Sequence, residues 1–400
     1  MADNAVITGL GAVSPVGMGK EVFWKALIEK TSGIKKISKF DTAPHPYHQA
    51  AEITDFSFEN YVFDKRFRRI ADISRYAMAA TILAQKDAKL KKLDAKKTLL
   101  IFCTNLGPIN MSRMFKKGLV AGDGASPMLF ADSVLNAPAG NIALYLGLKG
   151  ACYTHIGGGP AGIKAIGFAV DYLTTGRADF AIVVGAEELD EVVHYSFSKF
   201  GYLFPSDVDN NDWSPFNHNR KGFVMGEGAG AIVLERKEDA IKRDAKIYAK
   251  VGGWSSGFSL NGNDEALTKT MAKSIDMGKL EPDSIDYISI GSNGGPLDHL
   301  ETKSLKTFFN KSPLTPLIGS LRPNTGEIFS ATTFLQIIAA SLMMEKETVL
   351  PNINPSGMHP EWCDFHAPSE VVRSPLNTAL INAIGMEGSC ASLIIKRLEV

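Results

Sequence analysis

The chain has 400 residues, of which 45% are hydrophobic and 22% are charged, an ordinary composition for a globular protein of two or three domains or one large unit. Its 43 Lys and Arg balance 43 Asp and Glu, so no overall charge attracts it to nucleic acid or to an anionic membrane. Four cysteines without a short-spaced pair argue against a disulfide framework or a structural zinc site.

The hydropathy pattern indicates where the protein resides. No stretch approaches 18 uninterrupted apolar residues, so we expect no membrane span. The opening MADNAVITGLG lacks the basic segment that begins a signal peptide. We therefore predict a cytoplasmic protein.

In the first half of the chain, short apolar runs alternate with longer helical patterns. Nearly continuous apolar runs closed by Gly or polar residues predict buried strands at 5–11, 98–105, 151–156 and 180–188. Apolar residues at helical spacing predict helices at 21–30, 72–88 and 163–175. This alternation predicts a largely parallel sheet that helices cover on both faces.

The second half repeats the pattern. Strands are predicted at 246–253, 286–293, 316–323 and 378–388, with helices at 298–309 and 332–344. FAIVVGAEE (180–188) and ALINAIGMEG (379–388) are alike, since each is an apolar strand that ends in a Gly-containing turn and an acidic residue. We predict a duplicated core with halves 1–240 and 241–400, joined in the charged segment 236–245.

A glycine-rich corner, THIGGGPAGIKAIGFA (154–169), follows the third predicted strand. Gly157, Gly159 and Gly162 fit the G-x-G-x-x-G pattern of dinucleotide binding. That site needs an acidic residue about 20 positions on, whereas Glu187 follows Gly162 by 25. Two other interpretations stay open: close packing of a helix on a strand, or a nucleophile presented at a helix N-terminus.

Downstream segments carry a specific resemblance. SPFNHNRKGFVMGEGAGAIVLE (214–235), VITGLGAVSPVG (6–17) and VLPNINPS (349–356) resemble the signature segments of β-ketoacyl synthases, the condensing enzymes of fatty-acid and polyketide assembly. The match runs in order from residue 6 to residue 396. It implies an α/β, thiolase-like fold of two duplicated βαβαβαββ halves in a five-layered αβαβα arrangement.

The resemblance also implies where a catalytic Cys-His-His triad would lie. The nucleophile position falls on Gly159, the first His on Gly291 when the motif is anchored on Pro296, and the second His on Glu327. Arg322 takes the place of the family's Lys, and the aromatic gating turn becomes 384–388, with Ile384 and Met386 in place of Phe. No small shift restores the triad, because no Cys lies between 152 and 363 and no His between 299 and 359.

These replacements predict a degenerate site. Gly159 cannot form a thioester, and Gly291 has no side chain to donate to an enolate oxygen. An ionised Glu327 would repel a developing anion. We expect Glu327 to form an ion pair with Arg322 rather than act as a new general base, and Cys152 to be a buried, unreactive thiol.

A synthase-like chain that lacks the triad resembles the chain-length factors, or ketosynthase β subunits, of type II polyketide systems. The resemblance implies an active ketosynthase as partner and a chain-elongation tunnel shared with it. Acyl carrier protein would deliver phosphopantetheine to the partner, so this chain needs no cofactor of its own. Two alternatives stay open: a homodimeric enzyme with altered acyl-thioester chemistry, and a non-catalytic scaffold that binds acyl carriers.

Two apolar segments would face the partner and shape the tunnel. Their candidate side chains are Leu106, Ile109, Met111, Met114, Phe115, Met128, Leu129 and Phe130. Ordinary interface packing explains them equally well. A basic cluster is either an ordinary solvated face or a docking site for an acidic carrier; it consists of Lys35, Lys36, Lys65, Arg66, Arg68 and Arg69.

Overall fold

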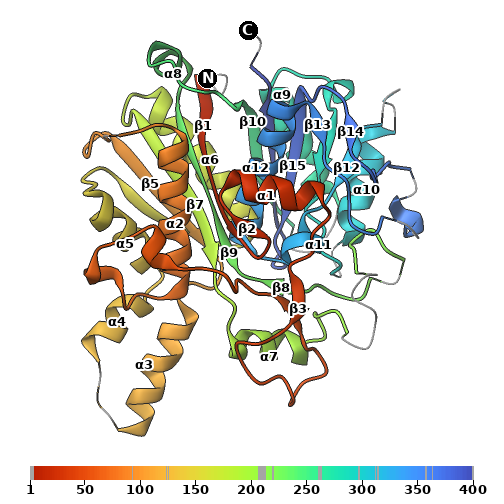
Figure 1. Cartoon of the computed structure of the whole chain (residues 1–400). Coiled ribbons are helices and arrows are strands. Elements are labelled where there is room, and N and C mark those ends of the chain that lie inside the picture. The colour runs from red at the N-terminus through yellow and green to blue at the C-terminus, as the bar shows by residue number, and fades with distance from the viewer. Residues whose placement is uncertain are drawn as a thin grey trace.

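The computed structural model describes residues 4–91, 93–122, 124, 126–205, 213–218, 220–259, 264–295, 298–310, 312, 315–355, 358–362 and 364–398. Two equivalent sets of strands make up its main sheet (Figure 1). The first set is β1 (Ala5–Ser14), β5 (Thr98–Thr104), β6 (Cys152–Ile156), β7 (Phe180–Glu187) and β9 (Gly228–Arg236). The second is β10 (Ala249–Phe258), β11 (Tyr287–Ser289), β12 (Leu317–Gly319), β15 (Thr378–Ile384) and β16 (Ser389–Lys396).

The two sets have the same strand order. The first runs β6-β5-β7-β9-β1 and the second β12-β11-β15-β16-β10, so in each set the third strand lies outermost and the first innermost. β1 and β10 pair antiparallel through Val6 with Lys250 and Ile7 with Ala249, which joins the sets into one hydrogen-bonded path. The repeated order confirms the duplicated topology expected from the sequence.

Helices form three layers around these strands. In the middle, α6 (Gly159–Thr174) and α12 (Ser330–Lys346) contact strands of both sets, and every α12 residue from Ser330 to Met344 is buried. α2 (Asp72–Asp87) and α5 (Ala137–Leu146) cover the outer face of the first set. α9 (Glu265–Met277) covers the second set, with α10 (Asp298–Phe309) packed against it. The layers are thus αβαβα, as expected.

One helical hairpin projects from this body. α3 (Ile109–Ala121) and α4 (Pro127–Ser133) extend below the first strand set in Figure 1. Among the described residues of the two helices, none is buried. The hairpin packs against the core at the start of α3, through the partly buried Ile109 and Met111.

The remaining elements are short. The helices are α1 (Lys20–Ile28), α7 (Glu191–Lys199), α8 (Lys237–Lys242) and α11 (Arg322–Thr325). The strands are β2 (Gly17–Met18), β3 (Ile34–Lys36), β4 (Gln49–Ala51), β8 (Met225–Gly226), β13 (Thr348–Val349) and β14 (Val372–Arg373). Single 3₁₀ turns occur at Phe58–Asn60, Lys65–Phe67, Pro282–Ser284 and Pro360–Trp362.

The sequence correctly predicted the strand at 151–156 but wrongly predicted that it is buried. β6 forms there, but it is the outermost strand of the path, and β5 is its only partner among the described strands. Cys152, Tyr153 and Ile156 are exposed, so Cys152 is not the buried thiol that we expected. The sequence analysis also assigned no strand to β9 or β16. Across the described ranges, none of the helices has the length and apolar character needed to cross a bilayer.

Candidate functional site

The position of the expected nucleophile carries no side chain, and residues of α12 and β15 pack close to it. Gly159 is the first residue of α6, where a nucleophile would benefit from the helix dipole. Thr333 Oγ1 of α12 donates a hydrogen bond to the Gly159 carbonyl oxygen at 2.9 Å. A Cβ added at Gly159 would lie 3.0 Å from Thr333 Oγ1 and 3.1 Å from Ala383 Cβ of β15. A side chain here would be tightly packed and would require Thr333 or Ala383 to shift slightly.

Gly291 lies just after β11, beside the same residue of β15. A Cβ at Gly291 would lie 3.2 Å from Ala383 Cα, so Ala383 neighbours both Gly159 and Gly291. The amides of Gly291 and Ser292 donate to the buried Glu301 carboxylate at 3.0 and 2.7 Å. Pro296, the anchor of the motif, lies outside the described residues. The two candidate positions are therefore neighbours, and neither offers a side-chain donor.

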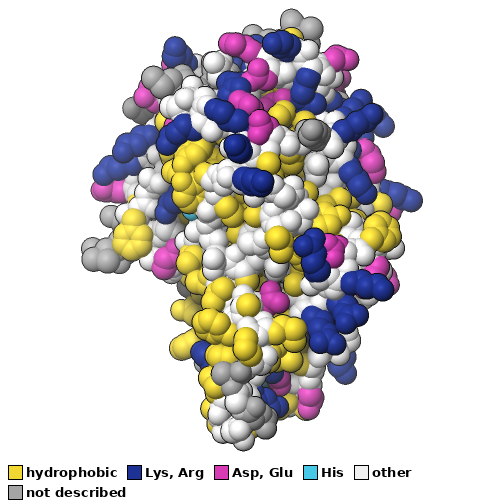
Figure 2. All heavy atoms as spheres, turned by 90° about the vertical axis from the view of Figure 1, so that its left-hand side faces the viewer, with side chains coloured by type: hydrophobic (Ala, Val, Ile, Leu, Met, Phe, Trp, Pro, Cys, Tyr) yellow, Lys and Arg dark blue, Asp and Glu magenta, His cyan; other side chains and the backbone are white. Residues whose placement is uncertain are grey.

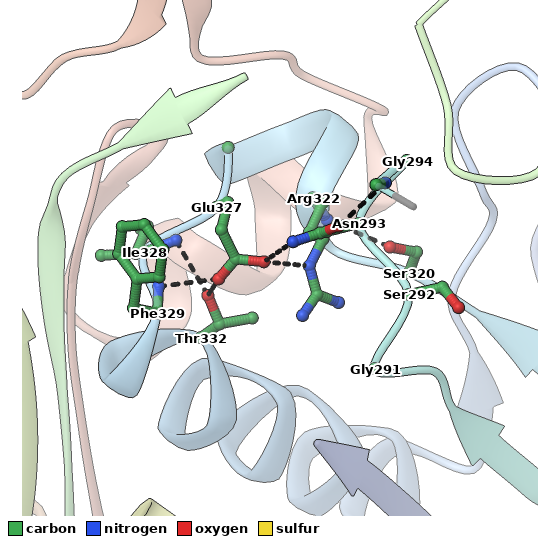
Figure 3. A network of polar contacts seen from close by, with 12 residues as sticks. Gly291, Ser292, Asn293, Gly294, Ser320, Arg322, Glu327, Ile328, Phe329 and Thr332 are labelled. Carbon is green, nitrogen blue, oxygen red and sulfur yellow. Dashed lines mark hydrogen bonds and ion pairs between the residues drawn. The ribbon is translucent and has the colours of Figure 1, made fainter. Parts of the chain in front are cut away.

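Glu327 is held by four donors (Figure 3). Its Oε2 accepts from Arg322 Nε at 2.7 Å and from Asn293 Nδ2 at 3.1 Å. Its Oε1 accepts from the Phe329 amide at 2.7 Å and from Thr332 Oγ1 at 3.1 Å. The Glu327 carboxylate thus has donors on both oxygens, which suits a structural ion rather than a proton carrier.

Arg322 completes this arrangement. Only about 5% of Arg322 and 4% of Glu327 is exposed, so the expected ion pair is present and is fully desolvated. Arg322 Nη1 also donates to the Ile290 carbonyl oxygen at 3.0 Å, next to Gly291. The pair thus occupies the position at which the sequence resemblance led us to expect the second His, and its bond to Ile290 connects it with the loop after β11.

A small cavity adjoins these residues. It has a volume of about 110 Å³. Its walls include the loop after β11 and the expected gating turn; the lining residues are Tyr202, Phe223, Gly291, Ser292, Asn293, Gly295, Asp298, Ile384 and Met386. The structure therefore brings Ile384 and Met386 to the same site as Gly291.

Three aromatic rings that the sequence analysis did not single out pack beside Glu327. The ring centroids of Phe197 and Phe329 are 5.7 Å apart, those of Phe197 and Phe223 are 5.3 Å apart, and those of Phe223 and Phe329 are 6.2 Å apart. Leu106 and Ile109, two of the tunnel candidates, pack against the same buried cluster. These two side chains contribute to packing next to the site.

The remaining tunnel candidates lie on the projecting hairpin. Met114, Met128 and Phe130 are exposed, and the rings of Phe115 and Phe130 are 5.4 Å apart across α3 and α4. Figure 2 views the molecule from this side, and hydrophobic side chains gather over its lower, projecting part. Met111 also lies on α3, but it is partly buried and packs against the hydrophobic cluster that includes residues of α2. The candidates therefore divide between the core and an exposed apolar surface.

The described part of the chain contains no group of three or more His, Cys, Asp or Glu side chains placed to hold a metal ion.

Two carboxyl groups near the site, those of Glu187 and Asp298, are fully buried, and their negative charge would be only partly compensated by neighbouring groups. Burial raises the pKa of Glu187, at the end of β7, to about 8. It raises the pKa of Asp298, which accepts from the Asn293 and Gly294 amides, to about 7.

Comparisons with known proteins agree with this architecture. Residues 2–240 match the model of the β-ketoacyl synthase N-terminal domain, and residues 247–356 match that of the C-terminal domain. A 3-oxoacyl-[acyl-carrier-protein] synthase 2 of Staphylococcus aureus (strain N315) is 29% identical over 409 residues, which cover 99% of each chain.

Solved structures show the same fold. The ishigamide ketosynthase/chain length factor superposes with a TM-score of 0.92 at 26% identity, over 100% of both chains. A type II PKS ketosynthase in complex with its acyl-carrier protein superposes with a TM-score of 0.89 at 23% identity, also over 100% of both chains. With family models matching most of its length and this thiolase-like architecture, the chain belongs to the β-ketoacyl synthase family.

Proposed function

We propose that this chain is a catalytically degenerate ketosynthase-like subunit, a chain-length factor that pairs with an active β-ketoacyl-ACP synthase. The observation that carries the proposal is the Arg322–Glu327 pair. Glu327 stands where an imidazole would stabilise an oxyanion, and its carboxylate is already bound by four donors. Such a group neither donates to an oxyanion nor is available as a base.

The positions of Gly159 and Gly291 support the same conclusion. Neither residue has a side chain, and a Cβ at either would come within 3.2 Å of Ala383. The loss of all three cooperating groups leaves only substrate positioning. The alternative of a homodimeric enzyme with altered chemistry at Glu327 is disfavoured by the saturation of its carboxylate oxygens.

A partner surface is available on the exposed edge of the first strand set. Among the described strands, β6 pairs on one side with β5 and on the other side with none, and unpaired edges tend to recruit another strand. Ile156 of β6 is 61% exposed and Phe130 of the hairpin 55%. We propose that the active ketosynthase covers this surface and that the hairpin contributes to a shared tunnel.

The carrier protein would meet the pair rather than this chain's closed site. Lys65, Arg66, Arg68 and Arg69 are all exposed around the 3₁₀ turn at Lys65–Phe67, which gives a positive surface suited to an acidic carrier. Carrier-bound phosphopantetheine would then react in the partner subunit. Binding of carrier without any ketosynthase partner would instead favour the scaffold alternative.

Reconstitution tests the proposal. The chain alone, an active ketosynthase alone and the two together are supplied with loaded acyl carrier protein, and the products are weighed by mass spectrometry. We expect condensation only when the ketosynthase is present, and a narrower length distribution when the chain is added. Phe115→Ala, Leu129→Ala and Phe130→Ala should lengthen the products. Unchanged lengths in all three variants, with the complex intact, would exclude the chain-length role.

A further inference from the structure

The position of the α3–α4 hairpin is set at its root, by which we mean the start of α3 and the residues just before it. Neither helix buries a described residue, and the hairpin projects from the body (Figure 1). The hairpin nevertheless carries the exposed tunnel candidates Met114, Met128 and Phe130, together with the half-buried Phe115. Whatever fixes its root therefore also fixes where these side chains lie.

Two buried carboxyl groups at the end of β7, those of Glu187 and Glu188, hold the start of the hairpin. Glu187 accepts hydrogen bonds from the Leu106 amide at 3.2 Å and from Thr104 Oγ1 at 3.1 Å. Glu188 accepts from the Asn110 amide, in the first turn of α3, at 2.9 Å, and from the Ile73 amide of α2 at 3.1 Å. These bonds fix the point where α3 begins.

A third carboxylate, that of Asp190, contacts α3 about one turn further along the helix. Asp190 is buried and accepts from Arg113 Nε at 3.1 Å. The other oxygen of Asp190 caps α7 by accepting from the Val192 amide at 2.8 Å. Arg113 Nη2 in turn donates to Asn110 Oδ1 at 3.0 Å. Arg113 thus joins the first turns of α3 to the start of α7.

Ile109 and Met111 pack against the core at the start of α3. Further along the helix Arg113 reaches α7, where its Nη1 also lies 3.9 Å from Glu191 Oε2. A groove of about 590 Å³ separates the two helices, with Ile109, Lys116, Val120 and Val192 among its lining residues. A helix of 13 residues is about 20 Å long, so a tilt of about 10° would move its far end by roughly 3 Å. That is enough to displace a phenylalanine from a tunnel wall.

We propose that Arg113 is a positioning residue: its contact with Asp190 sets the tilt of the α3–α4 hairpin and thereby the length of chain that the shared tunnel admits. The effect on chain length rests on the proposed function, whereas the effect on the hairpin does not. Arg113 itself is not placed against the growing chain. It acts through the orientation of Met114, Phe115 and Phe130.

The test compares two charge-removing substitutions on the same helix. Arg113→Gln removes the contact with Asp190. Lys116→Gln removes an equal charge one turn further along, where Lys116 is exposed and makes no ion pair with any described residue. Arg113→Lys restores a cation that can reach Asp190. Hydrogen exchange of the amides at 109–122 is measured on each protein alone, and product lengths are measured on each reconstituted pair.

We expect exchange in α3 to rise about tenfold in Arg113→Gln, as loss of a charge-assisted bond predicts. It should stay unchanged in Lys116→Gln and recover in part in Arg113→Lys, and the product lengths should broaden in the same order. Unchanged exchange in Arg113→Gln overturns the proposal. Faster exchange with unchanged product lengths supports the positioning of the hairpin by Arg113 and overturns the chain-length function instead.

Discussion

The amide of Phe329 donates to Glu327 Oε1 at 2.7 Å, although Phe329 has φ 43° and ψ −110°. L-residues rarely adopt this conformation, which costs on the order of 1–3 kcal/mol and persists only where the surroundings impose it. Here the carboxylate two residues earlier provides that constraint, and the same oxygen also accepts from Thr332 in the first turn of α12. Glu327 therefore stabilises the start of the central helix.

Replacing Glu327 with Gln should strongly destabilise the fold. The substitution leaves the Arg322 guanidinium buried without its anion, a change that typically costs about 3–5 kcal/mol. The free energy of unfolding, from urea denaturation followed by circular dichroism, measures the effect. Glu265→Gln is the control, because Glu265 and Lys269 form a 2.9 Å pair in which both side chains are mostly exposed. That control should cost less than about 1 kcal/mol, and an equal cost for both variants would contradict the prediction.

The stability of the protein should fall as the pH rises from about 6.5 to 8. Burial raises the pKa of Glu188 and Asp298 to about 7 and that of Glu187 to about 8. In this range the native state therefore holds more protons than the unfolded state, and the free energy of unfolding decreases with pH. Thermal unfolding at several pH values measures the slope. Glu187→Gln should flatten it, and an unchanged slope would show that Glu187 does not titrate there.

The chain alone should not acquire an acyl group. The described thiols offer no activated nucleophile: Cys103 and Cys390 are buried, and desolvation raises the pKa of the exposed Cys152. Intact mass after incubation with labelled acyl-carrier protein should therefore stay unchanged. Gly159→Cys alone should not restore condensation, since Gly291 and Glu327 leave the oxyanion without donors.

Cys152→Ser provides the control for that experiment. An adduct that disappears in this variant would reflect exchange at a surface thiol of β6. A stoichiometric adduct that persists in Cys152→Ser would refute the degenerate-site proposal.

The edge of β6 should drive association. Expressed alone, the chain should self-associate at micromolar concentration, because an apolar edge strand is rarely left in water. We expect more than about 2,000 Å² to be buried in the pair. Ile156→Lys should weaken association at least tenfold by analytical ultracentrifugation. Val22→Lys is the matched control, since Val22 is 53% exposed on α1 and Ile156 is 61% exposed; a monomeric wild type would contradict this prediction.

Local sequence patterns predicted many of the elements, but the expected largely parallel sheet was wrong: five pairings along the main path are antiparallel and four are parallel. The predicted helix at 72–88 and the predicted strand at 180–188 match α2 and β7 closely, because each has its full apolar period within its own residues. The strand at 151–156 was assigned correctly as a strand but wrongly as buried. The burial of this strand depends on its place in the sheet. A local sequence pattern does not reveal whether another strand, from the same chain or from a partner, pairs with its outer edge.

The candidate site, too, could be predicted from the sequence only in part. Arg322 and Glu327 are five residues apart, so their pairing could be predicted from the sequence. The donors Asn293 and Thr332, which complete the shell around Glu327, come from a loop after β11 and from α12. Only the folded arrangement brings them together. The division of tunnel candidates between core and hairpin likewise depends on tertiary contacts.

The Arg322–Glu327 pair also restricts how this sequence can evolve. A histidine at 327 without a change at 322 leaves a buried guanidinium without its anion, and a neutral residue at 322 first leaves a buried carboxylate without its cation. Either single substitution passes through a destabilised protein, so selection for folding alone opposes both. The two residues are expected to change together over descent, and the charge complement at this site is expected to persist in lineages where the surrounding surface diverges freely.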